Sequence, residues 1–172
     1  MNLEKALLAE HSRVQAEKIA KYINKDSARF KTLMDVFFSN KYILTQRAAW
    51  VMSICVRKHP GLITPFLKKM IYNLEKPVHD AVKRNTVRIL QEIDIPDKLI
   101  GKTADSCFAL LTKPSEAIAI KAFSMTVLLN ITKKEPDLKN ELRIIIEDQM
   151  PYAKAAFLSR GKKTLKELEK LG

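Results

Sequence analysis

The sequence predicts an all-α fold, a right-handed α-solenoid of about four helix pairs preceded by an N-terminal capping helix or helix pair. Only 4 of the 172 residues are glycine, and 47% are hydrophobic. The apolar residues fall in runs broken by Lys, Arg, Glu and Gln, which is typical of amphipathic helices. These runs repeat about every 36–40 residues with two helices per period, which indicates an α-solenoid. We expect one domain over residues 1–172.

The period is visible in the prolines. The stretch Leu-x-Lys-Pro begins at Leu74 and recurs 37 residues later at Leu111. Pro60, Pro96 and Pro136 each follow a helical run, at spacings of 36 and 40 residues. Because proline ends one helix before the next begins, these positions mark turns.

A basic residue recurs with nearly the same period inside the second helix of successive units, at Arg47, Lys83 and Lys121. The residues four and seven positions after each are apolar, which places the basic side chains on the core face of their helices. These apolar residues are Val51, Ile54, Val87, Leu90, Met125 and Leu128. We expect the three basic side chains to extend along the boundary between repeats toward water.

The capping region is expected over residues 1–25, with a break near His11 because Ser12 and Gln15 match a capping box. The repeats are expected over residues 28–58, 65–93, 102–131 and 137–171. Their helices are expected over residues 28–38, 44–58, 65–74, 79–93, 102–111, 116–131, 137–147 and 153–171. Gly161 is expected to kink or fray the last helix, because glycine has a low helix propensity.

These turns and helices resemble the HEAT-repeat family. The resemblance covers residues 28–171 and rests on Pro77 and Pro114 at turns, on Val82-Lys83 and Ile120-Lys121 in place of the family's Val-Arg pair, and on Arg47-Ala48-Ala49. It implies stacked helix pairs whose second helices line a concave side. In the family's pattern an Asp stands about six residues before the Arg of each repeat. In this chain Lys41 stands six residues before Arg47, and Pro77 stands six residues before Lys83. The sequence therefore departs from the usual Asp–Arg ladder between repeats.

The charge is high and uneven. The net charge is +12, and residues 39–88 hold 10 basic residues against only Glu75 and Asp80. Such a surplus favours an anionic partner, of which nucleic acid is the commonest. A solvated surface that keeps the protein soluble explains the same surplus, so the charge alone does not choose between them.

The candidate binding site is a basic groove on the second helices, as the HEAT resemblance implies. Its residues are Arg47, Trp50, Arg57, Lys58, Lys83, Arg84, Arg88 and Lys121. Arg84 and Arg88 are four residues apart, so they share a helix face and repel each other. An anion lying along the groove would relieve that repulsion.

Candidate catalytic or cofactor sites are hard to find in the sequence. His11, His59 and His79 have no ligands at metal-binding spacing, and four glycines cannot build a phosphate loop. Cys55 and Cys107 lie among apolar neighbours and are expected to be buried free thiols. We therefore expect no metal, no cofactor and no catalytic residue.

Two enzyme families share fragments with this chain. The HEAT-like DNA alkylation repair glycosylases hold a damaged nucleotide with tryptophans, an Asp and an Arg. Here Trp50 lies beside Arg47, but Ile54 stands four residues on from Trp50, where an acid would be needed. The stretch Met150-Pro151-Tyr152-Ala153-Lys154 is similar to the fumarase and adenylosuccinate lyase signature, without its serine pair and with the Lys one position late.

The sequence thus favours a non-enzymatic scaffold that presents a basic concave groove to a protein, a peptide or another anionic partner. The alternative is a nucleic-acid-binding protein related to the alkylation repair glycosylases, and a lyase is a remote alternative. No apolar run approaches the roughly 18 residues that span a bilayer, and the N-terminus lacks the features of a signal peptide. We expect a cytoplasmic location, and the oligomeric state stays open.

Overall fold

The computed structural model describes residues 1–171 and, over those residues, contains ten α-helices, four short 3-10 turns and no strand. The prediction of an all-α fold is confirmed. The chain divides into two compact units, Met1–Asn85 and Thr86–Gly172. Each unit has its own buried apolar residues. Whether the two units act as one domain, as the sequence led us to expect, stays a prediction.

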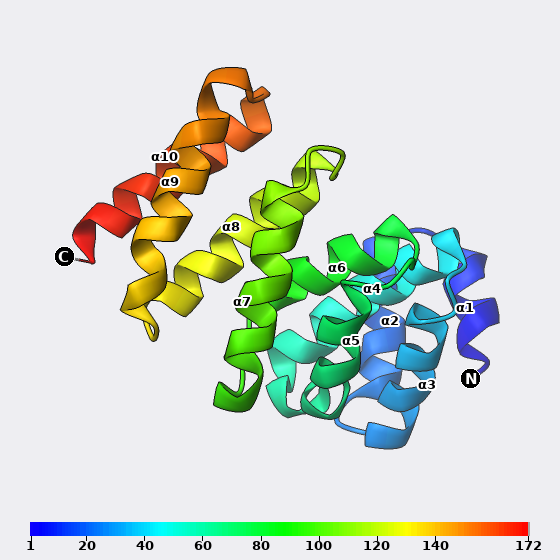
Figure 1. Ribbon diagram of the computed structural model, residues 1–172. Helices are drawn as coiled ribbons and strands as arrows, with labels where there is room; N and C mark the ends of the chain where they lie inside the picture. Colours follow the sequence, from blue (N-terminus) through cyan, green and yellow to red (C-terminus); the bar gives the residue numbers. More distant parts are fainter. Residues whose placement is uncertain (172) are drawn as a thin grey trace. The chain divides into compact units, whose positions relative to one another are not determined.

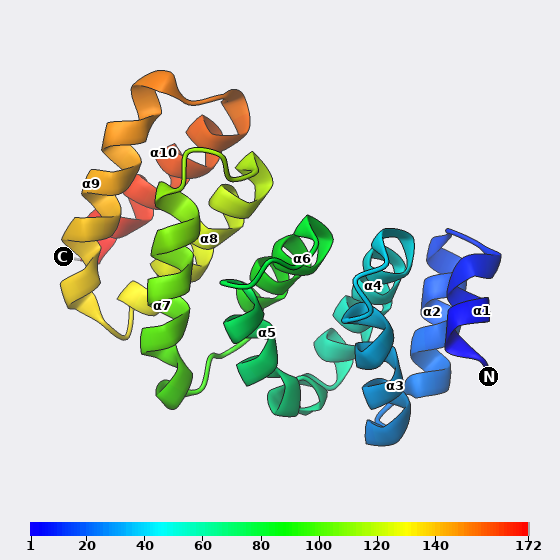
Figure 2. The ribbon, with the colours of Figure 1, turned by 45° about the vertical axis from the view of Figure 1, so that its right-hand side comes forward.

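The first unit is built around one long helix. Its elements are α1 (Leu3–Ala9), α2 (Arg13–Ile23), α3 (Ser27–Phe37), α4 (Tyr42–Lys58), η1 (Pro60–Leu62), η2 (Thr64–Phe66) and α5 (Leu67–Asn73), and α6 (Asp80–Leu90) carries the chain into the second unit. α4 packs against α1, α2 and α3, and Figure 2 shows α1 and α2 side by side. Phe30, Phe37 and Met52 are fully buried in this unit.

The first helices begin at residues that satisfy their free backbone N–H groups. Ser12 Oγ accepts a hydrogen bond from the Gln15 N–H at 3.1 Å, and Asp26 Oδ1 accepts from two N–H groups at the start of α3. Only half of the expected capping box forms, because Gln15 Nε2 donates instead to the Ala6 carbonyl at 2.7 Å. That bond links α2 to α1.

The second unit is built around α8. Its elements are α7 (Asp97–Thr112), α8 (Ile118–Thr132), η3 (Pro136–Leu138), α9 (Lys139–Gln149), η4 (Met150–Tyr152) and α10 (Ala155–Lys170). α8 packs against α7, α9 and α10, and in Figure 1 it lies between α7 and the α9–α10 pair. Because neighbours cover α8 on several sides, its buried side chains occupy most of its circumference.

The observed helix ends lie within three residues of the expected ones, with one exception. α7 was expected to begin at Lys102 but begins at Asp97, directly after Pro96. Gly101 falls in this early part of the helix and is exposed, with nothing within 4 Å of an added Cβ. The helix passes through this glycine because the rest of α7 packs on α8.

Gly161 does not interrupt or fray α10, and the expectation of fraying was wrong. The helix is continuous from Ala155 to Lys170 and Gly161 is buried. A Cβ added here would lie 3.1 Å from Ile146 Cγ2 on α9. The glycine therefore allows α10 to approach α9 closely.

Substitution of the two helical glycines with leucine should have opposite effects. Gly161→Leu should lower the free energy of unfolding by about 1–3 kcal/mol, because the larger side chain overpacks the contact with α9. Gly101→Leu is the matched control and should leave stability unchanged or raise it slightly, because its site is open and glycine is a poor helix former. Urea unfolding of both variants measures this, and equal stability of the two would contradict it.

Candidate functional site

α6 carries three cationic side chains that pair with no acid in the described part of the chain. Lys83, Arg84 and Arg88 are all half-buried, and none forms a salt bridge within residues 1–171. Asp80 is the only acid on the helix. Half-buried stems with charged heads near solvent are typical of long basic side chains on a helix surface. We call these three residues the α6 cationic row.

Arg57 and Lys58 lie in the last turn of α4 and are exposed. Cations at this position interact favourably with the negative end of the helix dipole. This interaction gives the two residues a local structural role, whether or not a partner also binds them.

Arg47 is held inside the first unit. Its guanidinium donates a hydrogen bond from Nη1 to the Leu7 carbonyl oxygen, at 2.7 Å. Leu7 lies in α1, one repeat before Arg47, so the bond fastens the N-terminal helix to α4. The expectation that Arg47 faces the boundary between repeats agrees with this contact.

Trp50 packs on the same N-terminal pair. Its ring meets the His11 ring edge-on, with centroids 5.5 Å apart, and the indole is half-buried. Arg47 and Trp50 together line a small hollow with residues of α1 and α2. Both side chains therefore contribute to holding the capping helices in place.

Lys121 is a buried residue of α8, with 9% of its surface exposed. Its Nζ donates to Gln149 Oε1 at 3.0 Å, and Gln149 Nε2 donates to the Leu111 carbonyl at 3.0 Å. Gln149 at the end of α9 thus joins α8 to α7. Burial lowers the pKa of the Lys121 amine, and the nearby Glu116 carboxylate opposes that shift.

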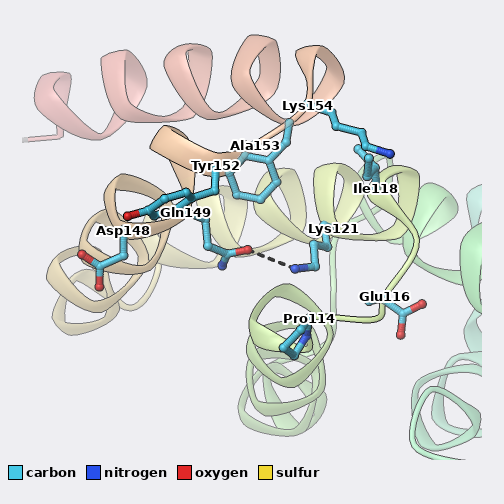
Figure 3. Close-up of a pocket in the computed structure, with 10 residues that line it drawn as sticks. Pro114, Glu116, Ile118, Lys121, Asp148, Gln149, Tyr152, Ala153 and Lys154 are labelled. Atoms are coloured by element: carbon cyan, nitrogen blue, oxygen red, sulfur yellow. Dashed lines mark hydrogen bonds between the residues drawn. The ribbon is translucent and has the colours of Figure 1, made fainter.

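A cavity of about 290 Å³ opens beside Lys121 in the second unit. Its lining residues are Pro114, Glu116, Ile118, Lys121, Asp148, Gln149, Tyr152, Ala153, Lys154 and Phe157. In Figure 3 the Lys121 amine points toward Gln149, whereas the carboxylates of Glu116 and Asp148 point away from that amine. Glu116 is paired with Lys113, with Oε2 and Nζ 3.7 Å apart.

The fragment Met150-Pro151-Tyr152-Ala153-Lys154 borders this cavity. Met150–Tyr152 form η4, and Lys154 precedes the first residue of α10. The fragment is therefore the turn between two helices of a repeat. Tyr152 is 91% exposed, so its ring stands in solvent at the rim.

Two asparagines make contacts that the sequence did not reveal. Asn24 and Asn40 have positive φ angles, 49° and 61°, which asparagine tolerates in turns better than most residues. Asn40 Oδ1 accepts the His79 N–H at 2.7 Å, and Asn24 Oδ1 lies 3.1 Å from His59 Nε2. Each contact joins turns about one repeat apart. Asn40 thus connects the α3–α4 turn to the α5–α6 turn, in a chain without the Asp of the HEAT pattern.

Cys55 and Cys107 are buried free thiols, as predicted. Burial raises the pKa of Cys55 to about 11 and that of Cys107 to about 12. Over residues 1–171 no group of three or more His, Cys, Asp or Glu side chains has the arrangement of a metal site. No helix in that part of the chain is long and apolar enough to cross a membrane.

Consecutive helix pairs, joined by side-chain contacts one repeat apart, define a helical-repeat protein. A family model described as a HEAT repeat domain matches residues 3–168, and the chain belongs to the HEAT repeat family. No curated protein and no solved structure matches the chain. HEAT repeats are helical scaffolds that typically mediate protein interactions and are generally non-enzymatic.

Loss of the Arg47 guanidinium should loosen the N-terminal helix. Hydrogen bonds from charged groups contribute about 1.5–3 kcal/mol, so Arg47→Ala should speed amide hydrogen exchange in α1 by about ten-fold or more. Arg57→Ala is the control, since Arg57 is exposed and makes no salt bridge within the described chain. Exchange in α1 that is the same in both variants would show that Arg47 does not hold this helix.

Proposed function

We propose that this protein is a non-enzymatic binding scaffold whose α6 cationic row receives an acidic segment of a protein partner. The observation that carries the proposal is the absence of any acid paired with Lys83, Arg84 or Arg88 within residues 1–171. Some cations on other helices and turns of residues 1–171 do pair with acids, as in Arg13–Glu17 at 2.8 Å and Lys134–Asp94 at 2.6 Å.

Repulsion along α6 supports the same proposal. Arg84 and Arg88 are one turn apart, and such like-charge pairs destabilise a helix by about 0.2–0.5 kcal/mol. A carboxylate placed between the two guanidinium groups removes this repulsion and accepts hydrogen bonds from both. Arginine suits this role because its planar guanidinium binds carboxylates in a bidentate manner.

A protein partner is favoured over nucleic acid by the family, because HEAT repeats typically mediate protein interactions. The row also offers only three cations, whereas phosphate-backbone binding commonly uses about 6–10 contacts. Arg47 is bonded to a backbone carbonyl and Lys121 is buried, so neither adds an exposed charge to the row.

Binding of two labelled anionic probes tests the proposal: a short polyglutamate peptide and a short DNA duplex, each titrated at several salt concentrations. The double variant Arg84→Ala, Arg88→Ala should bind polyglutamate about ten-fold more weakly, because two charged contacts are lost. The matched control is Lys162→Ala, Lys163→Ala, which removes the same charge from exposed positions on α10. The control should bind as the unchanged protein does.

Three results would overturn the proposal. If both double variants weaken binding equally, net charge explains the affinity and the α6 cationic row does not. If the duplex binds more tightly than polyglutamate, with a steep dependence on salt, the nucleic-acid alternative is correct. If neither probe binds at low salt, the α6 cationic row is not a site for acidic ligands.

A further inference from the structure

We propose that the cavity beside Lys121 is a binding site for a carboxylate joined to an apolar group. The ligand is either a free organic acid or the C-terminal carboxylate of a peptide. The residues that line the cavity all belong to the second unit, and none of them is part of the α6 cationic row. Its volume of about 290 Å³ is at the lower end of the range for small-ligand pockets.

The Lys121 amine provides the anchor. An ammonium group has three donors, and over residues 1–171 this one makes a single hydrogen bond, to Gln149 Oε1. The residue is nine-tenths buried, and it lines the cavity. A carboxylate in the cavity would accept these free donors and neutralise a buried charge that is otherwise costly. Gln149 is a positioning residue. Its Nε2 donates to the Leu111 carbonyl, which fixes the side-chain amide so that Oε1 accepts from the Lys121 amine.

Two helix starts add to the positive potential of the cavity. Ile118 is the first residue of α8, Lys154 directly precedes α10, and both line the cavity. No side chain caps the first-turn N–H groups of either helix, although Glu116 Oε1 accepts the N–H of Ala117 just before α8, at 3.2 Å. The starts of helices carry partial positive charge and favour anions.

The acids of the cavity are directed away from the Lys121 amine, as Figure 3 shows for the carboxylates of Glu116 and Asp148. Glu116 Oε2 forms an ion pair with Lys113. Part of the wall is apolar and is formed by Pro114, Ile118 and Phe157. These apolar walls and the single buried cation suit a singly charged carboxylate on a hydrophobic group better than a phosphate.

Calorimetric titration of the full chain with benzoate and with benzamide tests the charge requirement. Benzoate should bind and benzamide should not, because they differ in the carboxylate. Lys121→Met keeps the length of the side chain and should weaken benzoate binding at least about ten-fold. Lys154→Met changes only an exposed rim residue and should weaken it by a smaller factor. The control Lys163→Met, at an exposed position on α10, should bind benzoate normally.

A peptide ending in phenylalanine, as the free acid and as the amide, distinguishes the two sources of carboxylate. Tighter binding of the free-acid peptide than of benzoate points to a chain terminus, and the reverse points to a small organic acid. Equal binding of benzoate and benzamide would sink the proposal. So would no binding of any carboxylate, or binding that survives both Lys121→Met and Lys154→Met.

The pH dependence gives a second readout. Because burial lowers the pKa of Lys121, its ammonium loses its proton at a pH below the ordinary value of 10.5. Benzoate affinity should therefore fall as the pH rises through that lowered pKa, whereas residual binding to Lys121→Met should lack this step. The other charged or titratable groups of the cavity are Glu116, Asp148, Tyr152 and Lys154, all of which the variant retains. A step of the same size in both proteins would contradict the role of Lys121.

Discussion

A helix pair in this protein cannot bury its apolar face alone, and contact with the neighbouring pair is the constraint on which the structure depends. Polar contacts among residues 1–171 mark this stacking, because several of them join residues 35 to 40 positions apart. Those separations lie at or close to the repeat length. Arg47 to Leu7 is one example in the first unit, and Gln149 to Leu111 is one in the second. Each repeat thus satisfies polar groups of the repeat before it.

The same constraint explains the different behaviour of the basic residues. Arg47 and Lys121 hold corresponding positions in their repeats and both bond to a neighbouring repeat. Lys83 stands at the corresponding position of α6 without a salt bridge among residues 1–171. The same position of the repeat therefore bonds to a neighbouring repeat at Arg47 and at Lys121. At Lys83 it carries a charge that has no salt bridge within residues 1–171. The two proposed sites, the α6 cationic row and the Lys121 cavity, arise from these differences between otherwise similar units.

Periodicity predicted the helices well because helix ends and apolar faces depend on local residue types. Pro77, Pro114 and the apolar residues after Arg47 were enough to place the repeats. The partners of the polar residues could not be predicted in this way. Arg47 bonds to a backbone carbonyl, and no residue type in the sequence encodes such an acceptor. The cavity was also beyond prediction, because it depends on how α8, α9 and α10 pack around one glutamine.

The two buried cysteines have a practical consequence for spectroscopy. Only a thiolate reacts with maleimide and similar reagents, and thiols with pKa values of about 11 and 12 are almost entirely protonated near neutral pH. The folded chain should therefore behave toward such labels as a cysteine-free background. A single cysteine introduced on the surface of either unit then accepts a fluorophore or spin label selectively. Labels in both units would give the distance between them in solution.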